Sequence, residues 1–248
     1  TGKTSSARIF AKSLNCQAYD QPTATPCGKC ELCRQISESN ALDVIEIDAA
    51  SNTGVENIRE IIDRARFAPT QAKWKVYVID ECHMLSTAAS NALLKTIEEP
   101  PANVVFILAT TNPERVLTTI QSRCQRFDFK RIEIITIFNQ LVEIAKKESI
   151  KSEEQALKLI AKRSNGGMRD GLSLLDQLMS VSEDKEINVS DVSMVLGTVD
   201  DEQIISFLNK CFASDSTACK DLMSMFESGV DVFQLYDDVI HYLHYHFL

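Results

Sequence analysis

Short runs of strand-forming residues alternate with helix-spaced segments in the first half of the chain. The runs cover residues 44–48, 75–80 and 104–109, and the one at 75–80 contains four consecutive apolar residues, at 76–79. A continuous apolar run is typical of a strand that is buried on both faces of a parallel sheet. Between the runs, residues 55–67 and 85–99 place apolar side chains three and four positions apart, which predicts helices. This order predicts an α/β domain with a parallel sheet.

The second half of the chain shows helical spacing in place of strand-like runs. Apolar residues recur at helical intervals at about 132–148, 153–164, 168–180, 190–197, 201–212, 215–227 and 232–248. The last of these segments resembles the start of a helix that is cut short. The pattern predicts that helical domains follow the α/β domain.

Two carboxylates, Asp80 and Glu81, come directly after the four apolar residues of the central run. Because ligands of open α/β sheets bind beyond the carboxyl ends of the strands, both acids are expected at a ligand site. An unpaired charge there is costly to desolvate, and a magnesium nucleotide supplies a partner for it. The first acid is suited to hold the metal with its water shell, and the second to orient or deprotonate an attacking water. The alternative is a solvated loop after a core strand.

The first residues of the chain match the end of a phosphate-binding loop. Thr1-Gly2-Lys3-Thr4 corresponds to the last four positions of the pattern G-x-x-x-x-G-K-[ST]. Gly2 lets backbone N–H groups approach phosphate, Lys3 reaches the β- and γ-phosphates, and Thr4 offers its hydroxyl to magnesium. A helix is expected from Ser5 to about Asn15, with its positive N-terminus at the phosphates.

This short loop match is a weak signal alone, but a buried strand that ends in Asp-Glu strengthens it, and the two together predict a nucleotide site. The first glycine of the loop and the strand that should precede it are missing, so this chain is expected to bind nucleotide poorly. Thr110 and Thr111 follow the run at 104–109, where polar side chains would face the γ-phosphate or an attacking water. A simple turn rich in Ser and Thr is the alternative.

Cysteines gather after the first expected helix. Cys16, Cys27, Cys30 and Cys33 have the spacing C-x10-C-x2-C-x2-C. Tight C-x2-C knuckles hold thiolates at tetrahedral spacing, and four sulfurs complete a structural zinc site with no open position. An iron–sulfur cluster or a set of free thiols are the alternatives, although no redox partner motif is visible. The remaining cysteines are scattered and are expected to pack as small apolar residues: Cys82, Cys124, Cys211 and Cys219.

Composition limits the remaining classes. With 248 residues, the chain is long enough for two or three domains with their own cores. A net charge of -9 argues against a protein coated in nucleic acid, but it allows a local basic strip. No apolar run approaches the roughly 20 residues that a membrane helix needs. Eight cysteines without a visible secretory signal indicate a reducing compartment.

Several motifs occur together with the cysteine cluster. They are Ile47-Asp48-Ala49-Ala50-Ser51, the stretch Leu93-Leu94-Lys95-Thr96-Ile97-Glu98-Glu99-Pro100-Pro101, and Ser122-Arg123-Cys124. In this combination the chain resembles the gamma/tau subunits of bacterial DNA polymerase III, which are AAA+ ATPases of the sliding-clamp loader. The resemblance covers essentially the whole chain and is most specific over residues 16–129. A zinc knuckle after the P-loop helix separates these subunits from other AAA+ proteins.

The resemblance implies a role for each matching position of the nucleotide site. Lys3 and Thr4 match the Walker A lysine and threonine. Thr1, Gly2 and Ser5 belong to the same loop and are also expected to contact the nucleotide. Asp80 and Glu81 match the Walker B acids, with Asp80 on magnesium together with Thr4, and Glu81 as the base.

Three further positions match functional residues of this family. Thr111, or its neighbour Thr110, falls at the sensor 1 position. Arg123 matches the arginine finger, which reaches the nucleotide of an adjacent subunit and acts there in trans. Arg169, in Gly167-Met168-Arg169-Asp170, falls at sensor 2 and touches the nucleotide of its own subunit.

The family fold implies three domains. An N-terminally truncated AAA+ ATPase domain would span 1–130 and contain the zinc module at 16–33. A helical lid would span 131–196, and the start of an all-α oligomerisation collar would span 197–248. The implied function is that of the ATP-driven motor subunit of the clamp loader, which loads the sliding clamp onto primed DNA in bacterial replication.

The cofactors implied are ATP, Mg²⁺ and Zn²⁺. The partners implied are the other clamp-loader subunits in a ring, the sliding clamp, primed DNA, and the replicative polymerase, which would bind through a missing C-terminal part. The implied location is the replisome in the bacterial cytoplasm, and no membrane partner is implied. The loop at 51–54 is Ser-Asn-Thr-Gly, where some relatives carry basic residues that face DNA. This departure leaves Arg59 and Lys95 as candidates for phosphate contacts, which position a protein without reading sequence.

Two other classes of protein share some of these features. Asp80-Glu81-Cys82-His83 resembles the D-E-x-H box of helicases, but no later helicase motif is present and the Ser-Arg-Cys motif is an AAA+ feature. His83 is then expected to be a packed or hydrogen-bonded residue. A non-catalytic scaffold is the second alternative, and the presence of both Glu81 and Arg123 argues against it.

Overall fold

The computed structural model describes residues 1–181, 186–196, 201–227 and 232–247. The chain forms two compact units, one of residues Gly2–Phe129 and one that begins at Lys130. The sequence predicts a domain boundary between residues 196 and 197, inside the second unit. Residues 197–200 lie outside the described residues. Each unit is described by itself.

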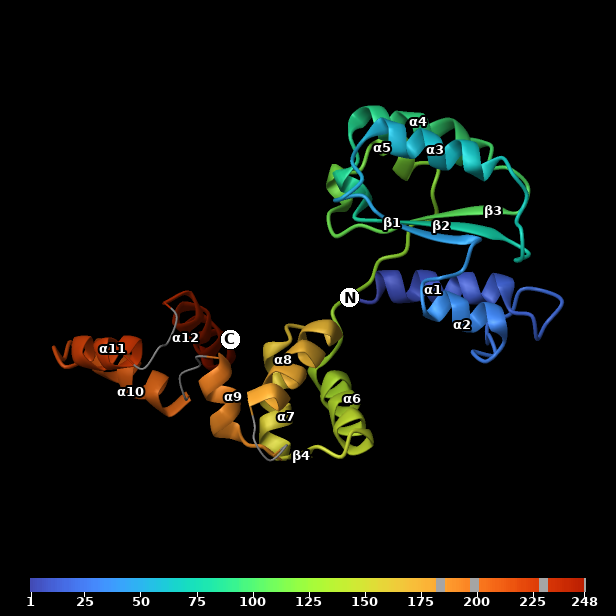
Figure 1. Cartoon of the computed structure of the whole chain (residues 1–248). Helices are drawn as coiled ribbons and strands as arrows, with labels where there is room; N and C mark the ends of the chain where they lie inside the picture. The colour runs from blue at the N-terminus through green and yellow to red at the C-terminus, as the bar shows by residue number, and fades with distance from the viewer. Residues whose placement is uncertain (182–185, 197–200, 228–231, 248) are drawn as a thin grey trace. The chain divides into compact units, whose positions relative to one another are not determined.

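The first unit contains a parallel three-stranded sheet (Figure 1). Its strands are β1 (Val44–Asp48), β2 (Lys75–Asp80) and β3 (Val104–Leu108), in the order β1-β2-β3. The three predicted strands and their parallel arrangement are thus confirmed. The register pairs Asp48 with Asp80, so two acids lie side by side at the carboxyl edge of the sheet.

Helices cover both faces of this sheet, as Figure 1 shows. The face toward the bottom of the view carries α1 (Lys3–Asn15) and α2 (Glu31–Ser37), and the opposite face carries α3 (Val55–Ala65), α4 (Thr87–Glu98) and the short α5 (Thr118–Gln121). The helix α2 was not predicted, because proline and glycine dominate the residues before it and its own seven residues span only two turns.

The central strand β2 explains why both faces are covered. Val76 and Val78 pack toward α1 and α2, whereas Tyr77 and Ile79 pack toward α3 and α4, and all four side chains are fully buried. Side chains of a strand alternate between its faces, so a fully apolar strand requires a layer on each side. This burial fixes β2, and with it the position of the residues that follow Ile79.

The second unit begins with a helical domain. Its helices are α6 (Ile134–Lys147), α7 (Glu154–Arg163), α8 (Met168–Val181) and α9 (Val189–Leu196). They enclose a core that includes Ile137, Leu141, Ile160 and Leu178. Two strands that were not predicted, β4 (Lys151–Ser152) and β5 (Glu186–Ile187), pair in parallel beside this core and are too short to produce a sequence pattern.

The turn before α8 requires glycine. Gly166 has a φ of +80°, and a Cβ there would lie 2.5 Å from the Cβ of Arg131. Both the left-handed backbone and the close approach exclude other residues. The turn therefore fixes the start of α8 against the segment that enters this unit.

Helices complete the chain. They are α10 (Asp201–Phe212), α11 (Ala218–Glu227) and α12 (Val232–Phe247), with a small core of Ile204, Met225 and Leu235. The predicted final helix is confirmed up to Phe247, and Leu248 lies outside the described residues. Among the residues that the structure describes, no helix combines the length and apolar character needed to span a membrane.

Candidate nucleotide and metal sites

The first residues of the chain form the start of α1. Gly2 has a φ of +84° and caps this helix, and its carbonyl accepts a hydrogen bond of 2.9 Å from the N–H of Ser6. The helix begins at Lys3, two residues earlier than expected, so Lys3, Thr4 and Ser5 lie in its first turn. The free N–H groups of a first turn and the helix dipole favour an anion at this end.

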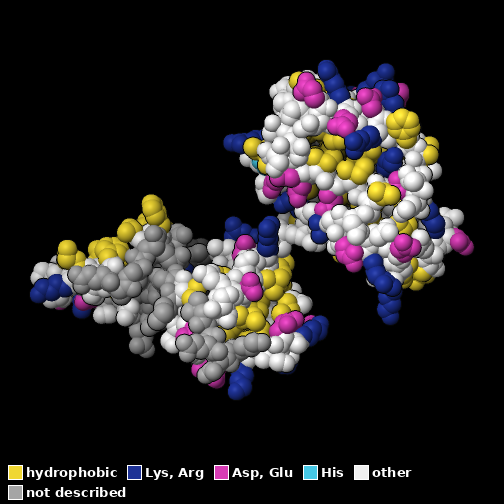
Figure 2. Space-filling model, viewed as in Figure 1, with side chains coloured by type: hydrophobic (Ala, Val, Ile, Leu, Met, Phe, Trp, Pro, Cys, Tyr) yellow, Lys and Arg dark blue, Asp and Glu magenta, His cyan; other side chains and the backbone are white. Residues whose placement is uncertain are grey.

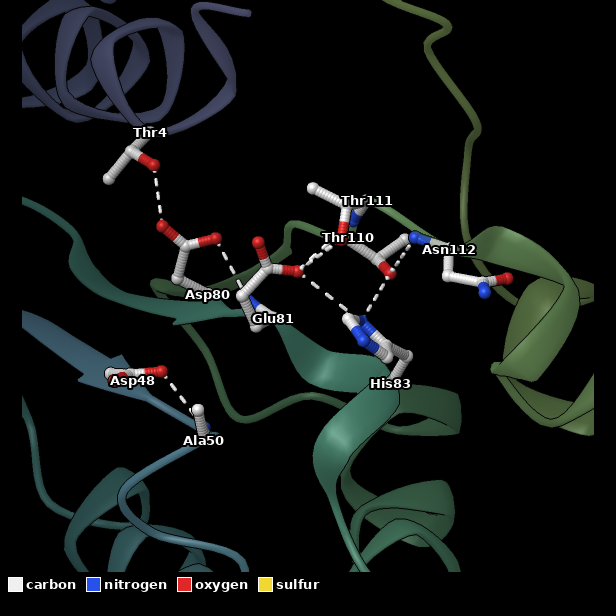
Figure 3. A network of polar contacts seen from close by, with 9 residues as sticks. All are labelled: Thr4, Asp48, Ala50, Asp80, Glu81, His83, Thr110, Thr111 and Asn112. Carbon is white, nitrogen blue, oxygen red and sulfur yellow. Dashed lines mark hydrogen bonds and ion pairs between the residues drawn. The ribbon is translucent and has the colours of Figure 1, made fainter. Parts of the chain in front are cut away.

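Thr4 and Asp80 connect this helix to the carboxyl end of β2. The Thr4 hydroxyl donates to Oδ2 of Asp80 at 2.6 Å, and Oδ1 of Asp80 accepts from the backbone N–H of Glu81 at 2.9 Å (Figure 3). The two positions that the sequence pairs through a metal are therefore in direct contact. A hydroxyl and a carboxylate oxygen are both suitable ligands for Mg²⁺.

Glu81 has an unusual backbone. Its φ of +46° and ψ of 43° place it in the left-handed region, which is rare for a residue with a side chain. The chain turns sharply here, and the N–H of Cys82 donates to the carbonyl of Ala109 at 2.9 Å. Strained positions of this kind persist where the surrounding structure fixes them, and they cluster at functional sites.

The Glu81 carboxylate is held by residues that follow β3 and β2. Its Oε2 accepts from the backbone N–H of Thr111 at 3.1 Å and from the Thr111 hydroxyl at 2.9 Å, and it lies 3.3 Å from Nδ1 of His83. Figure 3 shows these side chains pointing toward one another across the ends of two neighbouring strands.

Thr110 and His83 form a second layer of this network. The Thr110 hydroxyl lies 2.9 Å from Nδ1 of His83 and accepts from the N–H of Asn112 at 3.0 Å. His83 is thus hydrogen-bonded, as predicted. The two candidate threonines have different partners, because Thr111 contacts the Glu81 carboxylate and Thr110 contacts His83.

One acid at this edge was not selected from the sequence. Asp48 ends β1 beside Asp80, and its carboxylate accepts from the N–H of Ala50 at 2.9 Å and from the Ser51 hydroxyl at 3.0 Å. The signal was present, since Asp48 is the last residue of a predicted strand. Its carboxylate holds the loop that leaves β1.

Arg123 lies just after α5 and contacts the end of α4. Its Nε donates to Oε1 of Glu98, and its Nη1 donates to the carbonyl of Thr119 at 2.7 Å and to the Ser122 hydroxyl at 3.3 Å. Three other predicted cations are exposed. Arg59 lies on α3 and Lys95 on α4 in the first unit, whereas Arg169 lies in the first turn of α8 in the second unit.

Four cysteines come together between α1 and α2. The sulfur atoms of Cys16, Cys27, Cys30 and Cys33 all lie within 4.8 Å of one another. A tetrahedral site with Zn–S bonds of about 2.3 Å separates its sulfurs by roughly 3.8 Å, so the cluster is close to the required geometry. The cysteines of the described residues form no disulfide, so the four sulfur atoms of this cluster can all bind one metal ion.

The thiols of this cluster differ in acidity. Backbone N–H groups of Lys29 and then Cys30 donate to the sulfur of Cys27 and lower its pKa to about 6. Burial raises the pKa of the Cys33 thiol to about 12. Amides that point at a sulfur stabilise a thiolate, which is the form that binds a metal.

The other four cysteines follow the expectation only in part. Cys82 is buried in the core, and this burial raises the pKa of its thiol to about 12. The prediction that the others pack as apolar residues is wrong, because Cys124, Cys211 and Cys219 are exposed.

Comparison with known proteins places these features in a family. The family described as DNA polymerase III, delta subunit, matches residues 1–133, and the family described as DNA polymerase III clamp loader subunit, ATPase lid domain, matches residues 136–184. The chain is 47% identical over 243 residues to DNA polymerase III subunit tau of Bacillus subtilis, covering 98% of this chain and 43% of that protein. It is 48% identical over 207 residues to the Escherichia coli subunit tau, covering 84% of this chain and 32% of that protein. The chain thus spans less than half the length of these relatives.

Solved structures agree on the fold. The RuvB Holliday junction branch migration motor of Thermotoga maritima aligns with 85% of this chain and 73% of its own, at 18% identity and a TM-score of 0.53. At this identity the likeness shows the AAA+ P-loop fold alone. The family described as DNA polymerase III, delta subunit, matches more than half of the chain, the clamp loader lid family follows it, and relatives at 47% and 48% identity are named DNA polymerase III subunit tau. The chain therefore belongs to the family of DNA polymerase III clamp-loader subunits that includes gamma/tau.

Proposed function

We propose that this chain is part of an ATP-hydrolysing motor subunit of the bacterial sliding-clamp loader, which drives loading of the clamp onto primed DNA within the polymerase III holoenzyme. One observation carries the proposal. A continuous set of contacts runs from Thr4 through Asp80 and Glu81 to Thr111, and it joins the P-loop helix to the ends of two adjacent strands. These groups are the ones that a phosphoryl-transfer site needs.

Phosphate binding is assigned to the start of α1. Backbone N–H groups from Thr1 to Ser5 and the left-handed turn at Gly2 form the cradle, and Lys3 supplies a positive charge beside it. The helix dipole adds to the same potential. This part of the site binds and positions the nucleotide.

Thr4 and Asp80 would hold Mg²⁺. Their oxygens already lie 2.6 Å apart, which fits a pair of ligands on one ion or on its water shell. When bound, the ion neutralises charge on the β- and γ-phosphate oxygens.

Glu81 is assigned as the residue that orients or deprotonates the attacking water. It lies at the carboxyl end of β2, one residue beyond Asp80, and it is part-exposed. Thr111 donates two hydrogen bonds to Oε2 of Glu81. It is therefore assigned as sensor 1, because a movement of the residues after β3 would change the direction of the Glu81 carboxylate.

Two arginines complete the proposed site. Arg123 acts in trans on the nucleotide of an adjacent subunit, where a positive charge stabilises the transition state. Arg169 acts as sensor 2 on the nucleotide of its own subunit. ATP then favours an assembly that holds the clamp open, and hydrolysis removes these contacts and releases clamp and DNA.

The cysteine cluster is proposed to hold structural Zn²⁺. Four sulfurs within 4.8 Å fit a closed tetrahedral site, and the N–H groups aimed at Cys27 favour its thiolate. The ion would link the end of α1, through Cys16, to α2, through Cys33.

Oligomerisation is assigned to the collar helices α10–α12. They expose large apolar side chains, which mark an interaction surface, and Figure 2 shows apolar side chains at the surface of this part of the chain. The exposed residues include Phe212, Met223, Val232, Phe233 and Tyr236.

DNA contacts are assigned to Arg59 and Lys95. Basic side chains are mixed with acidic ones on the visible face of the first unit in Figure 2, which suits a few phosphate contacts better than a long basic track. The clamp, the other loader subunits and the replicative polymerase are the proposed protein partners, at the replisome in the bacterial cytoplasm.

The proposal is tested by Glu81→Gln in the full-length protein. The variant keeps the size of the side chain and removes its charge, so ATP binding should change by less than about threefold while turnover falls at least about a hundredfold. Isothermal titration with ATP and a phosphate-release assay measure the two quantities. Unchanged hydrolysis would remove Glu81 from the reaction.

A further inference from the structure

The ion pair of Arg123 with Glu98 joins two segments that are 25 positions apart in the sequence. Glu98 is the last residue of α4, and Arg123 follows the C-cap of α5, the short helix that packs against α4. A carboxylate in the last turn of a helix is unfavourable for the helix dipole. Helix stability therefore does not explain an acid at this position, whereas the nearby arginine does.

The contacts of Arg123 use two of the three nitrogen atoms of its guanidinium group. Nε donates to Glu98, and Nη1 donates to the carbonyl of Thr119 and the hydroxyl of Ser122. An arginine has five N–H donors, and these contacts engage three of them. Among the residues that the structure describes, Nη2 takes part in no hydrogen bond, so its two donors are available to an anionic oxygen.

The pair is also exposed. The side chains of Arg123 and Glu98 retain 37% and 44% of their accessible surface. Exposed ion pairs contribute little to stability, because water and salt screen them. They do limit the conformations of a long side chain, and an arginine that is already oriented loses less entropy when it binds a phosphate.

We propose that Glu98 is the positioning residue for Arg123, which it holds by Nε so that Nη2 is presented to a phosphate oxygen of the nucleotide on a neighbouring subunit. The inference rests on the proposed function of Arg123 in trans. Glu98 itself touches neither nucleotide nor metal in this account. It acts only through the direction of the guanidinium group, and this dependence on Arg123 is what an experiment can isolate.

The test is a double-mutant cycle in the full-length protein, assembled with its partner subunits and stimulated by primed DNA and clamp. Glu98→Gln should lower kcat for ATP hydrolysis about tenfold, with KM for ATP and the thermal unfolding midpoint unchanged. Glu99→Gln, at the adjacent exposed position, is the matched control and should be as active as the parent protein. In an Arg123→Ala background, Glu98→Gln should cause no further loss.

Three results would overturn the inference. The first is full or increased activity of Glu98→Gln when Arg123→Ala is impaired, and the second is an equal loss from Glu98→Gln in both backgrounds. The third is full activity of Arg123→Ala, which would refute the role of Arg123 in trans and the inference with it. Because the single arginine variant is measured separately, a failure of the proposed function is distinguished from a failure of the Glu98 assignment.

Discussion

Thr111 donates two hydrogen bonds to a single oxygen of Glu81, one from its backbone N–H at 3.1 Å and one from its hydroxyl at 2.9 Å. The two residues follow the neighbouring strands β2 and β3 and are 30 positions apart in the sequence. The direction of the proposed base is therefore set by the tip of the adjacent strand as well as by its own backbone.

This contact predicts a selective kinetic defect. Thr111→Val removes the hydroxyl but keeps the backbone donor, so we expect kcat for ATP hydrolysis to fall roughly tenfold while the Kd for ATP stays within about twofold. Thr111→Ser retains a hydroxyl and should recover most of the rate. An equal loss in both variants would mean that the hydroxyl has no part in orienting Glu81.

The cysteine cluster predicts a stoichiometric metal. The purified chain should contain about one zinc ion, as measured by inductively coupled plasma mass spectrometry, and Cys30→Ser should lose it. Chelation should lower the thermal unfolding midpoint, because binding energy of a structural metal is also folding energy. Cys219→Ser, at an exposed position outside the cluster, serves as the control and should keep its zinc. Iron with visible absorbance would instead indicate an iron–sulfur cluster.

Asp43 predicts a pH dependence of stability. The residue is almost fully buried, and burial alone would raise the pKa of its carboxyl group. Backbone N–H groups of Gln71, Ala72 and Thr70 outweigh that effect, with help from the charge of Lys75, and hold the pKa below its ordinary value of 3.8. A carboxyl group with a lowered folded pKa stabilises the protein above its unfolded pKa, and this contribution is lost as pH falls through the folded value.

Asp43→Asn should therefore lower the free energy of unfolding by about 1–3 kcal/mol at pH 7, as measured by urea denaturation. The difference from the parent chain should shrink as the pH falls below about 4. Asp20→Asn, at an exposed position, should change stability by less than about 0.5 kcal/mol. A difference that stays constant down to pH 3 would contradict the account of Asp43.

The sequence predicted the elements that depend on a repeated local pattern. The strand β2 was recognisable because four apolar residues precede Asp80, and the same burial on both faces positions the two acids at the sheet edge. The cysteine cluster was recognisable from spacing alone, since knuckles with two intervening residues have a fixed geometry. Both signals are local, so one segment contains the necessary information.

Contacts between distant segments were not predictable in this way. Thr110 and Thr111 are adjacent and chemically identical, and only the turn after β3 decides which one reaches Glu81. The ion pair of Arg123 with Glu98 depends on how α5 packs on α4. These choices are made by tertiary structure, because neither partner has a pattern that identifies the other.

The central claim is most directly tested by ATP hydrolysis of the full-length protein assembled with its partner subunits. Rates are compared without effectors, with primed DNA, and with primed DNA plus sliding clamp, for the parent protein, Arg123→Ala and the control Arg126→Ala. We expect strong stimulation by DNA and clamp together, a loss on the order of a thousandfold in Arg123→Ala, and normal stimulation in Arg126→Ala. A basal rate that ignores the clamp, or full stimulation of Arg123→Ala, would contradict this claim.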